Sequence, residues 1–289
     1  MNSGQRLIVE LLRLHGGLVQ RTQLMKLLFL LGHETPLAGP RFPYGFVPYH
    51  YGPFSFAAYR DLARLAVAGC VEERSDGVRL AAGRRSAALA PAKRAALDQI
   101  VDRFGHVRPI NLRRYTYLHY PWYTVLSISK DPVAHRSGTL PVASPAVYTI
   151  GYEGRSIDRF LNELLRTGVR GVCDVRAVPA SRSYGFHRKT LSEHLARLGL
   201  EYHPFGELGI PTELRRAYLG YGGQGLAALL AQYRGWLPTA DVAVTQRLAD
   251  VVSGEPLALL CLESDPADCH RSVLAEAIGR MTGLPVAHV

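Results

Sequence analysis

The chain has 289 residues, of which 47% are hydrophobic and 20% charged, and a formal net charge of +10. This mixture is that of a folded protein of one or two domains and argues against wholesale disorder. No uninterrupted apolar run of about 18 residues is present, which excludes a membrane-spanning helix. The first residues lack the apolar block of a signal peptide. We therefore expect a cytoplasmic protein with no membrane partner.

The charge divides the chain into unlike halves. Residues 1–130 carry 18 Lys/Arg against 8 Asp/Glu, whereas residues 147–289 carry 15 of each sign. Residues 131–146 hold three prolines and no apolar period, so we expect a linker there between domains at 1–130 and 147–289. A basic half beside a neutral half predicts a nucleic-acid partner for the first. The alternative is that the positive charge reflects only a composition rich in arginine and carries no binding role.

The first half is predicted to be mainly helical. Leucines and isoleucine over residues 7–14 have helical spacing, Thr22 could cap a second helix, and Ser55 a third. Residues 71–80 follow as a hairpin around Asp76-Gly77. This order is typical of a winged helix-turn-helix, with a small helical interaction domain as the alternative.

Two aromatic segments lie in this half, PYGFVPYHYGPFS at 43–55 and NLRRYTYLHYPWYTVLS at 111–127. Aromatic rings beside Arg113 and Arg114 could stack on bases and neutralise phosphates. They could equally pack two loops together. GFVPYHYGPFS, with QLMKLLFLLG and YPWYT, resembles the Panacea (SocA-like) domain over about residues 5–130. That resemblance implies a non-catalytic domain that binds nucleic acid or a protein partner, in a bacterial defence or stress system.

The second half alternates strand-like and helix-like segments, which predicts a mostly parallel α/β sheet with helices on both faces. The overall fold class is therefore α/β with a helical N-terminal domain. Strands are expected at 146–152, 171–176, 200–205 and 256–263, and helices near 157–164, 190–198, 226–236, 244–252 and 272–281.

Polar residues follow the strands of this sheet, where ligands of such folds gather. ESDPADCHR follows the last strand; with Asp268 as N-cap, its helix would begin with three residues suited to an anion, Cys269, His270 and Arg271. The alternative is structural, with Arg271 paired to Glu263 or Asp174. A helix N-terminus would also favour the thiolate of Cys269, so thiol chemistry is a third and weaker hypothesis.

Two carboxylates at the strand ends, Asp174 and Glu263, are the candidate catalytic residues, because glycosidic-bond chemistry uses such a pair. Asp174 and Arg176 alternate on one strand and share a face, so they could hold a ribose and a phosphate or form a structural pair. The remaining candidates for substrate binding are Tyr152, Ser181 and Phe186, and those for nucleic-acid binding are His187, Arg188 and Lys189. GYGGQG at 220–225 is expected to be a flexible loop.

The four cysteines, Cys70, Cys173, Cys261 and Cys269, form no C-x-x-C pair and are expected to be free thiols. We expect no cofactor and no metal. Three histidines, His187, His203 and His270, could meet in space, but their spacing does not indicate a metal site.

Four segments of the second half, TIGYEGRSIDRFLNEL, VCDVRAVPASRSYGF, LEYHPFGELG and LLCLESDPADCHRSVLAEAI, resemble the family described as domain of unknown function 488 (YeaO-like) over residues 146–289. The resemblance implies a compact α/β domain with a polar site at the strand ends. The working hypothesis is hydrolysis of an N-glycosidic bond on normal or modified DNA, by base flipping, with a role in phage defence. The alternative is a non-catalytic regulator that senses a nucleotide or anion.

Overall fold

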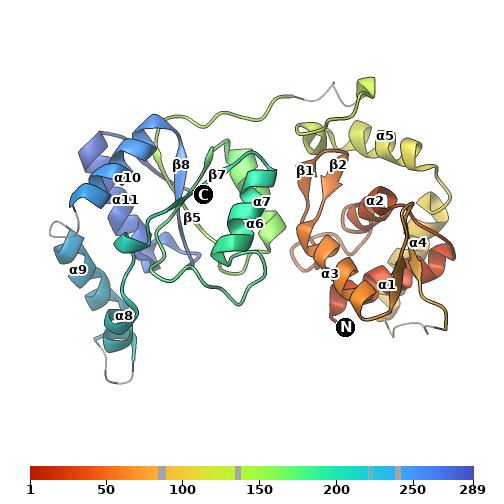
Figure 1. Ribbon diagram of the computed structural model, residues 1–289, viewed down its shortest axis with the longest axis horizontal. Coiled ribbons are helices and arrows are strands. Elements are labelled where there is room, and N and C mark those ends of the chain that lie inside the picture. Colours follow the sequence, from red (N-terminus) through yellow and green to blue (C-terminus); the bar gives the residue numbers. More distant parts are fainter. Residues whose placement is uncertain (84–88, 134–137, 221, 223, 238–241) are drawn as a thin grey trace. The chain divides into compact units, whose positions relative to one another are not determined.

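The computed structural model describes residues 1–83, 89–133, 138–220, 222, 224–237 and 242–289 (Figure 1). The chain folds into two compact units, Met1–Thr139 and Leu140–Val289. The boundary between them falls inside the segment 131–146 that we expect to be a linker. Part of that segment and part of the loop 220–225 lie outside the described residues.

The N-terminal unit is mainly helical, with two small antiparallel hairpins. Its elements are α1 (Ser3–His15), α2 (Arg21–Leu31), β1 (Val47–Tyr49), β2 (Gly52–Phe54), α3 (Phe56–Val67), β3 (Val71–Glu73), β4 (Val78–Leu80), α4 (Pro91–Phe104), α5 (Pro109–His119) and a 3-10 turn at Pro121–Thr124.

Local sequence accounts for most of these helix boundaries. Asn2 caps α1 through a capping box with Gln5, and Gly16 ends it in the left-handed conformation. Ser55 caps α3 as predicted, because its side chain accepts from the amide of Ala58. Thr22 does not cap α2: the N-cap is Gln20, which makes no side-chain capping bond.

The hairpin β3–β4 forms around Asp76-Gly77 as predicted, and its second strand is joined to the chain before α2. The amide and carbonyl of Val19 exchange hydrogen bonds with those of Val78, both at 2.8 Å. The observed order also places the hairpin β1–β2 between α2 and α3, and the winged helix-turn-helix stays a prediction. The aromatic segment at 43–55, in contrast, contains a hairpin, β1–β2, that the sequence did not predict.

The C-terminal unit has the predicted α/β fold. Its elements are β5 (Val147–Gly151), α6 (Ile157–Thr167), β6 (Gly171–Asp174), α7 (Arg188–Arg197), β7 (Glu201–Pro204), α8 (Thr212–Leu219), α9 (Leu226–Trp236), α10 (Val242–Gly254), β8 (Leu257–Cys261), α11 (His270–Thr282) and β9 (Val286–His288), with 3-10 turns at Gly206–Leu208 and Pro266–Asp268.

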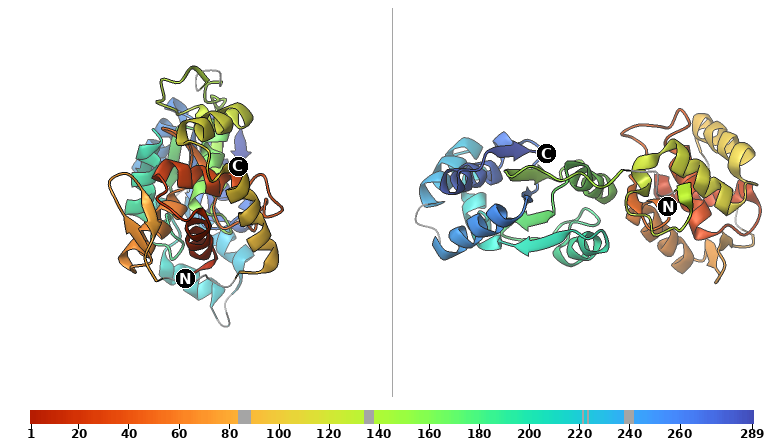
Figure 2. Two further views of the ribbon diagram at one scale, coloured as in Figure 1. Left: turned by 90° about the vertical axis from the view of Figure 1, so that its right-hand side faces the viewer. Right: turned by 90° about the horizontal axis from the view of Figure 1, so that it is seen from above.

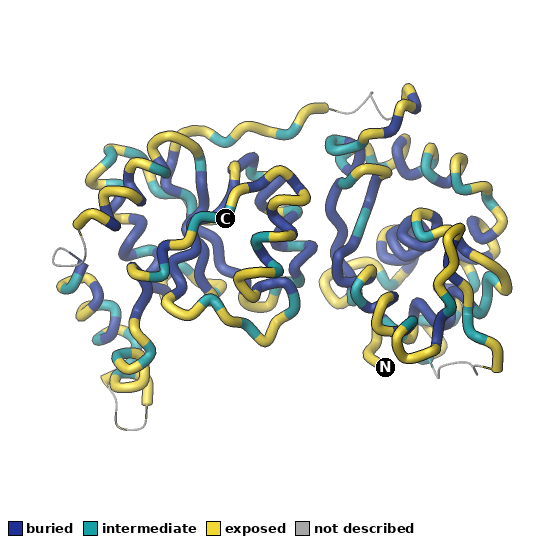
Figure 3. The backbone as a smooth tube through the Cα atoms, viewed as in Figure 1, coloured by how far each residue is buried: buried dark blue, intermediate teal, exposed yellow. Residues whose placement is uncertain are grey.

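Its five strands form one parallel sheet in the order β7-β6-β8-β5-β9. Helices α6 and α7 cover one face, and α10 and α11 cover the other (Figures 1 and 2). The inner strands are buried on both faces, as Figure 3 shows. The sequence missed the edge strand β9 and the helix α8.

Alternation along these strands assigns each side chain to a face. Cys173, Leu257 and Leu259 belong to the core that α10 and α11 cover. Asp174 therefore points to the other face, whereas Cys261, two residues after Leu259, points toward α11. Among the described residues, no helix is long and apolar enough to cross a membrane.

Candidate functional site

A pocket of about 180 Å³ lies at the carboxyl ends of the strands in the C-terminal unit. Its lining combines an aromatic ring, two guanidinium groups, a thiol and an imidazole, from Tyr152, Arg176, Arg215, Cys261 and His270. These residues come from the ends of β5, β6 and β8 and the starts of α8 and α11. The sheet therefore brings polar groups together at the edge where ligands of parallel α/β folds bind. We call this the strand-end pocket.

Asp174 and Arg176 form a buried pair with complete hydrogen bonding. Arg176 donates to both oxygens of Asp174, from Nε at 2.8 Å and from Nη2 at 2.6 Å. Tyr202 donates to the same carboxylate at 2.7 Å, and Arg176 donates to the Phe186 carbonyl oxygen at 2.9 Å. Burial lowers the pKa of Arg176, but the contact with Asp174 outweighs it and the pKa is raised.

This geometry gives Asp174 a positioning role. Its side chain is 1% exposed and is absent from the pocket lining, so a substrate at the pocket would meet Arg176 first. The two predicted carboxylates share no partner: Asp174 binds Arg176 and Tyr202, whereas Glu263 binds Arg215 and two thiols. The two carboxylates are therefore held by separate sets of contacts, and whether they flank a substrate stays a prediction.

Tyr152 and Phe186 stack on each other at 4.2 Å between ring centroids and with an interplanar angle of 13°. Phe186 is fully buried and also meets Phe160 edge-on. Only Tyr152 lines the pocket, with the Arg176 guanidinium 5.2 Å from its ring centroid. Phe186, a candidate for substrate binding, is therefore corrected to a buried packing residue that stacks on the ring of Tyr152.

A second polar cluster lies where β8 meets α11. The thiols of Cys261 and Cys269 donate to one oxygen of Glu263, at 3.2 and 3.0 Å. Nδ1 of His270 lies 3.8 Å from the first sulfur and 3.9 Å from the second, and its Nε2 lies 3.1 Å from the carbonyl oxygen of Val175. We call Cys261, Glu263, Cys269 and His270 the thiol cluster.

Electrostatics within the thiol cluster favour a negative charge. Burial opposes ionisation of Glu263, but hydrogen bonds from Arg215 and the two thiols outweigh it and lower the pKa of Glu263 to about 2. The hydrogen bond with Cys261 lowers the pKa of Cys269, and the same contact raises the pKa of Cys261. Arg215, on α8, donates to Glu263 at 2.7 Å. Arg215 and Cys261 were not among the predicted site residues.

The start of α11 differs from the prediction in two ways. Cys269, not Asp268, is the N-cap, because Asp265 caps the preceding 3-10 turn through the amide of Ala267. Arg271 is 1% exposed and donates to the backbone carbonyl oxygens of Glu263 and Ser264. It holds the loop after β8 and is absent from the lining of the strand-end pocket, so its predicted role with an anion stays a prediction.

The other predicted residues lie on exposed or half-exposed surface. Ser181 accepts from the amide of Ser183 at 3.1 Å, in the loop after β6. His187, Arg188 and Lys189 are exposed at the N-terminus of α7. In the N-terminal unit, Arg114 pairs with Asp131 at 2.7 Å, while Arg113 lies 6.0 Å from the ring centroid of Tyr51.

That tyrosine borders an aromatic pocket of about 260 Å³ in the N-terminal unit. Tyr51 and Tyr59 expose 44% and 42% of their surface there, and the buried Lys26 lies in the wall. Burial and, to a smaller extent, the nearby charge of Arg113 together lower the pKa of Lys26 to about 7. We call this the tyrosine pocket.

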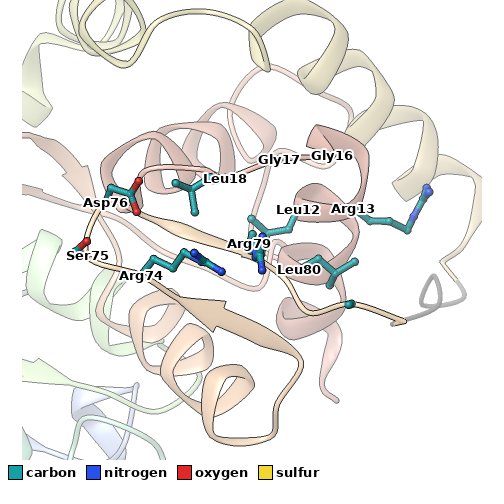
Figure 4. Close-up of a pocket in the computed structure, with 11 residues that line it drawn as sticks. Leu12, Arg13, Gly16, Gly17, Leu18, Arg74, Ser75, Asp76, Arg79 and Leu80 are labelled. Carbon is teal, nitrogen blue, oxygen red and sulfur yellow. The ribbon is translucent and has the colours of Figure 1, made fainter.

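A pocket of about 990 Å³ is an open hollow between α1 and the hairpin β3–β4 (Figure 4). Figure 4 shows Arg74 and Arg79 on the hairpin, and Arg13 extending away from them. Each is paired with a carboxylate: Arg13 with Glu10 at 2.7 Å, Arg79 with Glu72 at 2.7 Å and Arg74 with Glu72 at 3.6 Å. These ion pairs offset part of the positive charge, and we regard this pocket as the weaker candidate.

The C-terminal unit is thus a parallel α/β domain with a polar pocket at the strand ends. The family model described as "Domain of unknown function DUF488" matches residues 156–278, so the chain contains a DUF488 domain there. The match is narrower than the resemblance over 146–289 and leaves out β5 and β9. The resemblance of residues 5–130 to the Panacea domain stays a prediction. The comparison with curated proteins gave no match.

Proposed function

We propose that the protein acts on DNA and that its C-terminal unit hydrolyses an N-glycosidic bond at the strand-end pocket. The observation that carries the proposal is the combination of that pocket with a carboxylate held beside it. Arg215 lines the pocket and donates to Glu263 at 2.7 Å, so this carboxylate, itself outside the lining, would lie one side chain away from a molecule bound there. Hydrolysis through an oxocarbenium-like transition state needs such a charge.

The size of the pocket supports a small ring as the bound group. A volume of about 180 Å³ equals that of roughly six liquid water molecules. Pockets for larger organic ligands start at about 300 Å³. A single base or sugar extruded from the duplex would suit the space, with Tyr152 available for stacking and Arg176 for hydrogen bonding.

The roles of the residues follow from their contacts. Water adds its hydroxyl to C1′ of the sugar, and the base leaves with the electron pair of the glycosidic bond and takes up a proton. Glu263 is the carboxylate that would stabilise the positive sugar or orient the water. Asp174 is a positioning residue, because it acts through Arg176 and Tyr202.

The N-terminal unit supplies the second half of the proposal. Its exposed Tyr51 and Tyr59, beside Arg21 and Arg113, combine aromatic faces with positive charge. Such surfaces bind single-stranded or locally opened nucleic acid by stacking and phosphate contacts. We therefore propose the tyrosine pocket as the DNA-binding surface, and a role in phage defence remains an expectation from the Panacea resemblance.

The test is incubation of the purified full chain with DNA that carries normal and modified bases, with mass spectrometry of every product. We expect free base and abasic sites from the wild type and at least a tenfold lower rate from Glu263→Gln. Glu201→Gln is the matched control, because Glu201 is an exposed carboxylate on β7 of the same sheet. If DNA binds in a salt-sensitive way but nothing is released, the enzyme proposal fails and the non-catalytic sensor is favoured.

A separate variant tests the binding surface. Tyr51→Ala should weaken DNA binding by about tenfold or more, because base–aromatic stacking contributes about 1–3 kcal/mol for each base. Leu118→Ala, at another exposed apolar position of the same unit, is the control. Equal affinities of the two variants, measured by fluorescence anisotropy, would remove the tyrosine pocket from the proposal.

A further inference from the structure

Three potential metal ligands meet in the thiol cluster. The sulfurs of Cys261 and Cys269 and a ring nitrogen of His270 all lie within 4.8 Å of one another. In a tetrahedral zinc site, with Zn–S about 2.3 Å and Zn–N about 2.0–2.1 Å, a sulfur and a nitrogen ligand are about 3.6 Å apart. The two sulfur–nitrogen distances here are 3.8 and 3.9 Å. The spacing therefore suits a metal ion between the three atoms.

The orientation of His270 provides a second observation. Its Nε2 lies 3.1 Å from the carbonyl oxygen of Val175, which can only accept, so Nε2 carries the proton. Nδ1 then presents its lone pair to both sulfurs. Histidine ligands of metals are oriented in this way, with the second ring nitrogen donating to a backbone carbonyl or carboxylate.

Burial and access divide the cluster into a closed and an open side. Cys261, Cys269 and His270 are each less than 5% exposed. Cys261 and His270 also line the strand-end pocket, so one side of the cluster faces the space where a substrate would bind. Three protein ligands with one open position are typical of catalytic zinc, whereas structural zinc is closed by four.

We propose that Cys261, Cys269 and His270 bind a divalent transition metal of the zinc class, with its fourth position open to the strand-end pocket. Binding displaces the thiol protons that now point at Glu263, which leaves this carboxylate beside the metal. A bound metal of this kind supplies a hydroxide near neutral pH. The site does not depend on which bond the protein hydrolyses.

A disulfide between Cys261 and Cys269 is the competing explanation for two neighbouring thiols. It would draw the sulfurs together to about 2.05 Å. The lone pair of His270 Nδ1, which the Val175 contact directs at the two sulfurs, would then have no ion to bind. The arrangement of His270 therefore favours a metal over a disulfide.

The first experiment measures metal directly. The full chain, purified without a polyhistidine tag or chelator, is analysed by inductively coupled plasma mass spectrometry, and about one metal ion per chain is expected. Removal of the metal and addition of Co²⁺ should give thiolate-to-cobalt charge-transfer absorption. A chain that contains no metal and takes up neither Zn²⁺ nor Co²⁺ would overturn the proposal, as would a Cys261–Cys269 disulfide in the freshly purified protein.

Variants locate the site. Cys269→Ser and His270→Gln should each lower the affinity for Co²⁺ at least hundredfold, whereas Cys173→Ala, which removes a buried thiol on β6, should not change it. Glu263→Gln should change it by about tenfold or less, because Glu263 is not a ligand. Should Cys269→Ser fail to fold, the wild-type chain still provides a test, since Zn²⁺ should protect two thiols from alkylation.

Failure of this proposal is distinguishable from failure of the proposed function. A chain with bound metal and no base release would refute the glycosidic reaction and leave the metal site standing. Base release by a chain that contains no metal and takes up neither Zn²⁺ nor Co²⁺ would refute the metal site and leave the reaction standing.

Discussion

Each unit buries a cation beside a pocket, Lys26 in the N-terminal unit and Arg176 in the C-terminal unit, and the two are accommodated differently. Arg176 in the C-terminal unit has both oxygens of Asp174 as partners. Lys26 in the N-terminal unit, 2% exposed, has no carboxylate partner among the described residues. Burial disfavours both charges, but only Arg176 is compensated, so its pKa rises while that of Lys26 falls to about 7. Arg176 therefore stays charged and is hydrogen-bonded to Asp174 and to the carbonyl oxygen of Phe186. Lys26 instead loses its proton near neutral pH at the wall of the tyrosine pocket.

The largest effect is expected at Lys26. Its pKa is 10.5 when unfolded and about 7 when folded, so the unfolded chain binds more protons between these values. The free energy of unfolding of the N-terminal unit should therefore rise as the pH increases from 7 toward 10.5. Lys26→Met should remove this dependence and stabilise the unit by about 4 kcal/mol at pH 7, since one pKa unit corresponds to about 1.4 kcal/mol.

Denaturant titrations at several pH values measure this effect for each unit, because the two tryptophans, Trp122 and Trp236, lie one in each. Lys130→Met, at an exposed lysine of the same unit, is the control. A pH dependence that survives in Lys26→Met would show that another group titrates.

A smaller effect is expected when the paired cation loses its partner. Asp174→Asn leaves the Arg176 charge buried and should lower the free energy of unfolding of the C-terminal unit by about 3 kcal/mol. The double variant Asp174→Asn/Arg176→Met removes the charge as well and should recover part of that loss. If the double variant is less stable than Asp174→Asn, the Arg176 side chain stabilises the unit by its packing and hydrogen bonds as well as by pairing with the charge of Asp174.

The smallest effect is expected at Arg215, whose ion pair with Glu263 is partly exposed. The Arg215 side chain is 44% exposed, so solvent screens the interaction and Arg215→Gln should cost about 1 kcal/mol or less. The same titration, followed through Trp236, measures it. A loss above about 2 kcal/mol would mean that Glu263 depends on Arg215 for its burial and not only for its position.

Local sequence signals were sufficient where one residue decides the structure. Ser55 was predicted as an N-cap and accepts from the third helical amide of α3, and Ser156 does the same for α6. Thr22 and Asp268 carry the same chemistry but lie one or more positions away from the place where the helix begins. The sequence does not show that Asp265 first closes a 3-10 turn, which moves the start of α11 to His270.

The sequence predicted where the candidate site lies but not which of its side chains contact one another. The rule that ligands bind at the carboxyl ends of parallel strands correctly placed Tyr152, Arg176 and His270 around one pocket. The spacing of Cys261 and Cys269 gives no metal motif, because their approach depends on how the loop after β8 turns back to α11. Arg215 was missed because α8 was not predicted, and no local pattern marks it.

Gly151 at the end of β5 has no side chain to contribute to chemistry, yet it limits where Glu263 can be. A methyl group on Gly151 would overlap the backbone carbonyl of Glu263, which Arg271 holds by a hydrogen bond. Any larger residue there must displace the loop that carries Glu263. In a saturation mutagenesis screen for activity, Gly151 should therefore tolerate as few residues as Glu263 does, and a screen alone would mistake a packing constraint for a reactive group.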